Sequence, residues 1–207
     1  MARLSILILT HKRPKLFQRC LKSALHPGIE ILVNNDSNDV VCPENIKLFH
    51  KQGTLTEKYQ FLVEQASGDY VYFLEDDDVL FPAFFKVLGL LDNKDCYCGS
   101  YFIADSHIPF KDRSIRFNPN HEFQLSQCIF KKICLNFNNL KSCKSGESCI
   151  FNDYYLFKQS VKDYQVLDIL FFRQTIDGKD NISFLETSDL NKCKMCPWSR
   201  FNSDNSQ

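Results

Sequence analysis

Three mainly apolar runs stand out in the first half of the chain, at residues 5–9, 29–33 and 70–74. Because apolar and polar residues do not alternate within these runs, both faces of each segment are expected to be buried. Strands buried on both faces are typical of a parallel sheet that helices cover on either side. The pattern therefore predicts three central strands of an α/β protein.

Two segments between these runs carry apolar residues at helical spacing. The first opens at Pro14, a residue favoured in the first turn of a helix, and ends before Pro27-Gly28. The second covers residues 54–66. The apolar positions on the two faces are Leu16, Phe17, Cys20, Leu21, Ala24, Leu25, Leu55, Tyr59, Leu62, Val63 and Ala66.

This alternation of strand and helix predicts a parallel sheet with right-handed crossovers. In such sheets, ligands bind beyond the carboxyl ends of the strands. All three predicted strands end in polar residues: Thr10 and His11, the Asn-Asn-Asp of residues 34–36, and the Glu-Asp-Asp-Asp of residues 75–78. We therefore expect a binding site at this edge of the sheet.

The four consecutive carboxylates at residues 75–78 are the most informative cluster. Adjacent negative charges repel one another, and oxygen ligands are what Mg²⁺ and Mn²⁺ prefer. A divalent-cation site is therefore the functional interpretation of this run. The simpler alternative is a solvated acidic turn, as most charge runs are.

The second half of the chain is less regular. Strands are predicted at residues 96–104, 123–130 and 166–172, with a short helix at residues 131–132 and a longer one at residues 152–161. The polar segment 105–122 is expected to cover the site, and the polar tail from residue 187 is expected to end in disorder.

Length and charge narrow the class of protein. The 207 residues suffice for one well-buried core, and 44% of them are hydrophobic. The formal net charge of zero gives no overall basic field for non-specific nucleic-acid binding. The apolar run near the N-terminus is too short for a signal peptide, and residues 79–91 are interrupted by Pro82 and Lys86. We therefore expect a cytoplasmic protein without membrane insertion.

The ten cysteines are expected to be reduced and mostly buried, since nothing in the sequence indicates secretion. Cys193 and Cys196 have the spacing of metal ligands, but their possible partners Cys143 and Cys149 fit zinc poorly. A structural zinc at the first pair remains the alternative.

The same segments, in this order, resemble the family 2 glycosyltransferases of the GT-A fold. Residues 5–14 are similar to the opening strand and nucleotide-contacting turn of that family, and residues 31–39 to its second strand and Asp-Asp-Gly-Ser-x-Asp turn. Residues 66–78 resemble the segment with the DxD metal motif, which is the most specific match. Weaker likeness continues over residues 127–132, 152–157 and 172–183, so that the resemblance covers about residues 4–185.

The chain departs from this family at several positions. The two turn aspartates are Asn34 and Asn35, and Asp36 takes the glycine position, which leaves the donor nucleotide open. Lys58 stands near the usual Arg, as a candidate phosphate-facing cation. The DxD motif fits either Glu75-x-Asp77 or Asp76-x-Asp78, and the family register favours the first.

The resemblance implies a mostly parallel sheet flanked by helices, and a metal-dependent, inverting transfer of sugar from a nucleotide sugar. Asp77 and Asp78 would hold Mn²⁺ or Mg²⁺. Asp153 is the candidate general base, with Glu147 as the runner-up and an ordinary helix cap as the simpler role for Asp153. The residues implied to bind the nucleotide sugar are Thr10, His11, Arg13, Asn35, Asp36, Lys58, Glu75 and Asp76.

A single catalytic domain over residues 1–186 is expected, with a donor half at residues 1–92, an acceptor half at residues 93–186 and a tail at residues 187–207. The oligomeric state is left open. The acceptor is a glycan or, alternatively, hydroxymethylcytosine in DNA, as for some phage enzymes; a non-catalytic nucleotide-sugar-binding module is the second alternative. Basic residues able to contact DNA phosphates are Lys111, Arg113, Arg116, Lys131, Lys132, Lys141 and Lys144.

Overall fold

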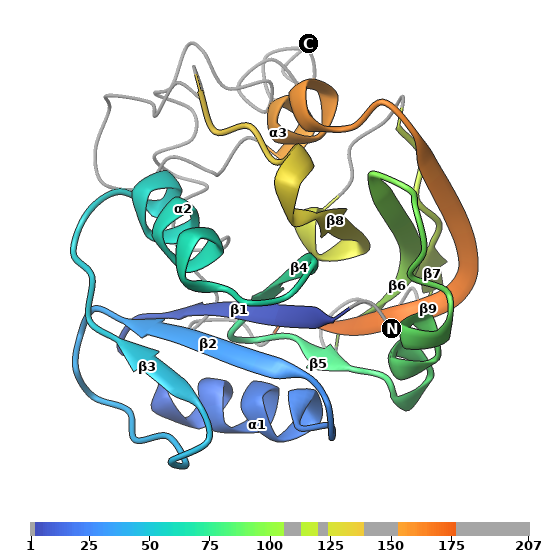
Figure 1. Cartoon of the computed structure of the whole chain (residues 1–207). Helices are drawn as coiled ribbons and strands as arrows, with labels where there is room; N and C mark the ends of the chain where they lie inside the picture. The colour runs from blue at the N-terminus through green and yellow to red at the C-terminus, as the bar shows by residue number, and fades with distance from the viewer. Residues whose placement is uncertain (1–2, 106–112, 120–123, 139–152, 177–207) are drawn as a thin grey trace, which may run out of the picture.

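A nine-stranded mixed sheet forms the centre of the molecule in the computed structural model (Figure 1). The structure describes residues 3–105, 113–119, 124–138 and 153–176. Along the sheet the strand order is β3-β2-β1-β4-β8-β6-β9-β5, and β7 pairs with β6 outside this path. The predicted α/β fold is therefore confirmed.

The elements have the following bounds. The strands are β1 (Leu4–Thr10), β2 (Glu30–Asn35), β3 (Lys47–Phe49), β4 (Tyr70–Glu75), β5 (Val79–Leu80), β6 (Cys96–Asp105), β7 (Arg113–Ile115), β8 (Cys128–Lys131) and β9 (Tyr164–Ile176). The α-helices are α1 (Pro14–Ala24), α2 (Leu55–Gln65) and α3 (Asp153–Ser160), and 3₁₀ helices cover Pro82–Gly89, Leu125–Gln127 and Lys132–Cys134.

Helices cover both faces of the parallel half of the sheet, as the mainly apolar runs predicted. Figure 1 shows α1 on one side of β1 and β2 and α2 on the other. Successive side chains of a strand point to opposite faces. Accordingly Ile6 and Ile8 of β1 belong to the core that contains α1, whereas Leu7 belongs to the core that contains α2.

The two helices begin by different local devices. Pro14 occupies the first turn of α1, after Lys12 in the left-handed region at φ 54°. Thr54 caps α2, and Glu57 completes a capping box in which each residue bonds to the other's main chain. A cap of this kind is worth about 1 kcal/mol of helix stability.

The C-terminal half joins the sheet through strands of both directions. β8 runs antiparallel to β4 and to β6, whereas β9 runs parallel to β6 and antiparallel to β5. The β6–β9 register shifts beside Gly99, where an added Cβ would lie 2.3 Å from the Phe171 ring. Glycine is thus required here by the close approach of a packed aromatic side chain.

The sequence pattern located the long strands and all three α-helices but missed several other elements. β3, β5, β7 and the 3₁₀ helix Pro82–Gly89 were not predicted, and β8 begins at Cys128 although a strand was expected from residue 123. Two- and three-residue strands are too short to show a period, so only pairing with a neighbour defines them. Most of segment 105–122 and the tail from residue 187 lie outside the described residues.

No helix among the described residues has the length and apolar character needed to cross a bilayer.

Candidate active site

The carboxyl ends of three neighbouring strands meet at one edge of the sheet, as the sequence predicted. In the parallel pairing, Thr10 of β1 lies opposite Asn35 of β2, and Leu9 lies opposite Glu75 of β4. The polar residues that follow these strands are therefore neighbours in space. They form two groups, one after β2 and one after β4.

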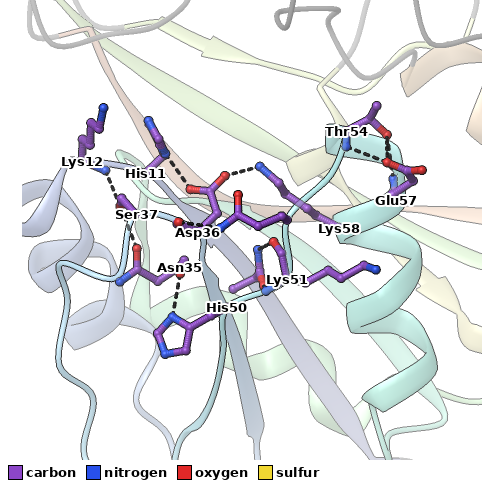
Figure 2. Close-up of polar contacts among 12 residues, drawn as sticks. His11, Lys12, Asn35, Asp36, Ser37, His50, Lys51, Thr54, Glu57 and Lys58 are labelled. Atoms are coloured by element: carbon purple, nitrogen blue, oxygen red, sulfur yellow. Dashed lines mark hydrogen bonds and ion pairs between the residues drawn. The ribbon is translucent and has the colours of Figure 1, made fainter.

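The first group is the Asp36 network, consisting of Asp36, His11 and Lys58 (Figure 2). The Nδ1 atom of His11 lies 2.6 Å from Asp36 Oδ1, and the Lys58 ammonium group pairs with Asp36 Oδ2. His11 lies in the turn after β1, Asp36 lies in the turn after β2, and Lys58 lies on α2. Burial works to raise the pKa of Asp36, but hydrogen bonds from Lys58 and His11 hold it below its ordinary value of 3.8.

Ser37 connects this network to the turn after β1 (Figure 2). Its Oγ accepts a hydrogen bond of 2.9 Å from the Lys12 amide and donates one of 2.8 Å to Asn35 Oδ1. The left-handed conformation of Lys12 costs about 1–2 kcal/mol for a residue with a Cβ. Such strain is common at functional sites. Here the left-handed residue lies in the turn after β1, directly before Arg13 at the start of α1.

The two asparagines in the family's aspartate positions have different roles. Asn34 bonds to the main chain of Lys51 through both its amide atoms, at 3.0 and 2.7 Å, and thus fixes the loop before α2. Asn35 is fully buried, and its Nδ2 donor has no hydrogen-bond partner in the described part of the chain. Buried polar groups in proteins nearly always have a partner. Asn34 thus uses its amide group to fix a loop, whereas Asn35 keeps a buried donor that lacks an acceptor.

The second group is the acidic segment, residues 75–78. Glu75 is exposed, whereas Asp76, Asp77 and Asp78 are only 1%, 6% and 1% exposed. The Arg13 guanidinium pairs with Asp76 and, at 3.0 Å, with Asp77 Oδ2. The solvated acidic turn, which was the simpler interpretation of this run, is therefore wrong for these three aspartates.

Burial raises the pKa of the aspartates in this segment. It raises the pKa of Asp76 to about 7, against the opposing effect of Arg13 and with a further increase from Asp77. Burial likewise raises the pKa of Asp77 despite Arg13. The charged form of these two carboxylates is therefore disfavoured by burial and favoured by nearby positive charge.

The aspartates are suited to a divalent cation that takes only some of its ligands from the protein. Within the described ranges, carboxylates do not form a group of three or more ligands within 4.8 Å of one another. A dedicated all-protein cage is therefore not formed here. Mg²⁺, however, commonly binds through one or two carboxylates, with substrate phosphates and water completing the shell. The carboxylate oxygens of the acidic segment are suited to that kind of site.

For the other predicted site residues, the structure describes the backbone position of Asp153 alone. Asp153 is the first residue of α3, and its side chain lies outside the described part, as do Glu147 and the pairs Cys193/Cys196 and Cys143/Cys149.

One of the basic residues considered for DNA contacts has a structural role. Lys132 donates from Nζ to the Ala66 carbonyl, and its amide donates to the Asp69 carbonyl. Lys111, Lys141 and Lys144 lie outside the described residues.

Sequence reasoning missed two features of this region and one elsewhere in the fold. Arg19 donates to the Asp77 carbonyl at 3.1 Å, and the Ser37 hydroxyl links Lys12 to Asn35. The third feature is a cluster of three buried cysteines elsewhere in the fold. Arg19 lies on the helix that follows Arg13, but its reach to the acidic segment depends on how α1 packs on the sheet.

The fold and the convergence of strand ends define an α/β domain with a candidate ligand site at the carboxyl edge of its parallel strands. The family described as glycosyl transferase family 2 matches residues 5–163. The chain therefore belongs to glycosyl transferase family 2. The match includes both groups of site residues and the start of α3.

Solved structures with the same fold include Staphylococcus aureus TarS. TarS 1–349 in complex with UDP is similar with a TM-score of 0.60 and 15% identity, over 84% of this chain and 60% of that one. The complex of TarS 1–349 with UDP-GlcNAc has a TM-score of 0.57 and 16% identity, over 83% and 58%. The bifunctional IspDF of Campylobacter jejuni has a TM-score of 0.51 and 12% identity, over 81% and 50%.

This chain spans 60% of the length of TarS 1–349 and 41% of that of the longer TarS structure. No curated protein matches the chain.

Proposed function

We propose that this chain is a metal-dependent, inverting glycosyltransferase that moves a sugar from a nucleotide-sugar donor to an acceptor hydroxyl. The observation that carries the proposal is the meeting of the Asp36 network and the acidic segment at the carboxyl edge of β1, β2 and β4, within the family match. This edge is where open α/β sheets bind their ligands.

The Asp36 network is assigned to the nucleoside end of the donor, together with Thr10 and Asn35. Asn35 Nδ2 is a buried donor that requires an acceptor, and a carbonyl oxygen or ring nitrogen of a pyrimidine base supplies one. His11 is half exposed and lies at the rim, in reach of a ribose hydroxyl. TarS, which shares the fold, has been solved with UDP and with UDP-GlcNAc. We therefore assign a pyrimidine nucleotide sugar as the donor.

The diphosphate is assigned to the space between the two groups, next to Arg13 and Lys58. Both cations are 16% exposed and are already positioned by aspartates, so little side-chain freedom is lost when an anion binds. Asp77 and Asp78 would hold Mg²⁺ or Mn²⁺, which when bound offsets the charge that develops on the leaving diphosphate. Glu75 and Asp76 complete this side of the donor site.

Asp153 is proposed as the general base that removes the proton of the acceptor hydroxyl. A carboxylate on the side of the anomeric carbon opposite the diphosphate gives attack in line with the leaving group, and therefore inversion. Support comes from its position at the start of α3, inside the family match. Residues 1–92 thus form the donor half and residues 93–186 the acceptor half, with a glycan as the acceptor.

The test is a transfer and hydrolysis assay over UDP-, GDP- and CMP-linked sugars, with Mn²⁺ and then with excess EDTA. We expect cleavage of a pyrimidine nucleotide sugar, loss of that cleavage with EDTA, and recovery when Mn²⁺ is restored. Cleavage that is unaffected by EDTA would contradict metal dependence. Binding without cleavage under all conditions would support the non-catalytic alternative instead.

Acceptors are compared in the same assay, with oligosaccharides beside DNA that contains cytosine, hydroxymethylcytosine or glucosylated hydroxymethylcytosine. Transfer to a DNA acceptor alone would contradict the assignment of a glycan. The anomeric configuration of the product, read by NMR, tests inversion.

A further inference from the structure

Three buried cysteines lie side by side on β6 and β8 and are not among the residues assigned to the candidate active site. Cys96 and Cys98 are two residues apart on β6 and therefore point to the same face. Cys98 is directly opposite Cys128 in the antiparallel pairing of β6 with β8. The Sγ atoms of Cys96 and Cys98 are 3.6 Å apart, and those of Cys98 and Cys128 are 3.8 Å apart.

The three Sγ atoms all lie within 4.8 Å of one another, and no other such group of potential metal ligands occurs in the ranges that the structure describes. Each of the three residues is 0% exposed. They belong to the core that also contains Phe117 and Phe130, together with Leu156 and Phe157 of α3. This core lies on the α2 side of the sheet, whereas the arginines and aspartates of the active site follow the strand ends.

The spacing of the sulfur atoms corresponds to that of thiolates around one metal ion. With a Zn–S bond of about 2.3 Å, two sulfur ligands of a tetrahedral zinc are about 3.8 Å apart. A disulfide would instead require one S–S distance of about 2.05 Å, and so a strong displacement of one pair. The third sulfur would then be left over.

We propose that Cys96, Cys98 and Cys128 form a binding site for a thiophilic d¹⁰ cation, Zn²⁺ in particular. Three Zn–S bonds replace three S–H bonds, and the protons pass to the buffer. Zn²⁺ with three thiolates has a net charge of −1, which costs less in an apolar core than the −2 of a monovalent ion with the same ligands. Soft sulfur ligands favour zinc over Mg²⁺ or Mn²⁺, so this site does not compete for the cation of the acidic segment.

Without a metal ion, burial favours the neutral thiols of Cys96 and Cys128, whose pKa it raises. The ion would connect β6 to β8, which in turn pairs with β4, the strand that leads into the acidic segment. The proposed role of the ion is therefore to stabilise the pairing of β6 with β8, through which the two halves of the sheet are connected.

The test uses the full chain with Cys143, Cys149, Cys193 and Cys196 replaced by serine, so that these four thiols cannot contribute. Because the cluster is buried, the protein is unfolded and refolded with CdCl₂ or ZnCl₂ and then desalted. We expect one equivalent of metal and, with Cd²⁺, the ultraviolet absorption band of cadmium thiolates. At a hundredfold excess over Kd, the melting temperature should rise by about 5–10 °C.

Cys98→Ala and Cys128→Ala should each abolish the band and the thermal shift, whereas Cys42→Ala and Cys134→Ala, outside the cluster, should leave both unchanged. X-ray absorption of the zinc-loaded protein requires no cluster variant and should give three sulfur ligands at about 2.3 Å. Absence of bound metal after refolding, fewer than three sulfur ligands, or a band that persists in Cys98→Ala would overturn the proposal.

Discussion

The Asp36 network and the acidic segment both pair carboxylates with basic side chains but differ in burial. In the network, the partly exposed Asp36 is contacted by two basic side chains, His11 and Lys58. In the acidic segment, the Arg13 side chain pairs with Asp76 and Asp77, which are both buried. The two groups are adjacent because β1, β2 and β4 are adjacent.

The pKa values report this difference. The pKa of Asp36 is lowered by its partners, whereas burial raises the pKa of Asp76 to about 7. A carboxylate with a lowered pKa stabilises the folded protein, and one with a raised pKa destabilises it at neutral pH. The network thus contributes to the stability of the fold, and the acidic segment reduces stability at a position where a cation and a diphosphate would compensate. The same substitution should therefore act in opposite directions in the two groups.

The largest effect is expected for Asp77→Asn in the acidic segment. Loss of a proposed metal ligand should lower the transfer rate by about 10²–10³-fold, because charge stabilisation in the transition state is lost. The melting temperature should stay the same or rise, since one buried negative charge is removed. Steady-state kinetics and thermal unfolding check the two parts. A large fall in melting temperature would show that Asp77 is mainly structural.

Asp36→Asn should have the opposite effect on stability. It leaves the Lys58 ammonium group, which is 16% exposed, without its carboxylate, at a cost of about 1–3 kcal/mol. This corresponds to a fall in melting temperature of about 2–4 °C per kcal/mol for a chain of this size. Asp39→Asn, which changes an exposed acceptor of Ser37 in the same turn, is the matched control. If Asp36→Asn and Asp39→Asn lowered the melting temperature equally, the stabilising role assigned to Asp36 would be contradicted.

Lys58→Met tests whether the network also binds the donor. Losing one charge-assisted contact to a phosphate should weaken donor binding by about tenfold, or 1.4 kcal/mol. Isothermal titration with the donor and Mn²⁺ measures this change. Lys51→Met is the control, because Lys51 is exposed nearby and its hydrogen bonds with Asn34 use the main chain. A similar loss in both variants would indicate a general effect of charge.

The smallest effect concerns pH. Because the pKa of Asp36 is lowered, the stability that it contributes is fully present above its ordinary pKa of 3.8 and is lost as the pH falls below that value. The difference in unfolding free energy between the wild type and Asp36→Asn should therefore be constant from pH 7 to pH 5 and shrink below pH 4. Denaturant unfolding at each pH checks this expectation. A difference that grows on acidification would contradict it.

The elements that the sequence pattern located are those that one local feature of the sequence is enough to form. Residues 5–9 and 70–74 are apolar on both faces, and β1 and β4 form there. Thr54 and Glu57 form a capping box that depends on three-residue spacing alone, and α2 begins after it. β5, in contrast, has two residues and exists because Leu80 and Val79 pair with β9, more than 90 positions away in the chain.

The candidate site was also predicted in part. That Asp36 and the acidic segment would lie at one edge followed from the order of strands and helices. The sequence did not predict which of Asn34 and Asn35 has a structural role. That depends on where the Lys51 main chain passes, because Asn34 bonds to it. The pairing of Arg13 with Asp76 and Asp77, 63 and 64 positions apart in the chain, likewise depends on the packing of α1.

The sequence by itself determined the class of fold, the edge of the sheet that carries the polar residues, and the family, because these depend on local periodicity and on residue order. Only the tertiary structure decided which carboxylates are buried, which cations balance them, and that Cys128 joins Cys96 and Cys98. The reason is physical: burial and charge pairing are set by distances between segments that are remote in the chain, and a linear pattern contains no such distances.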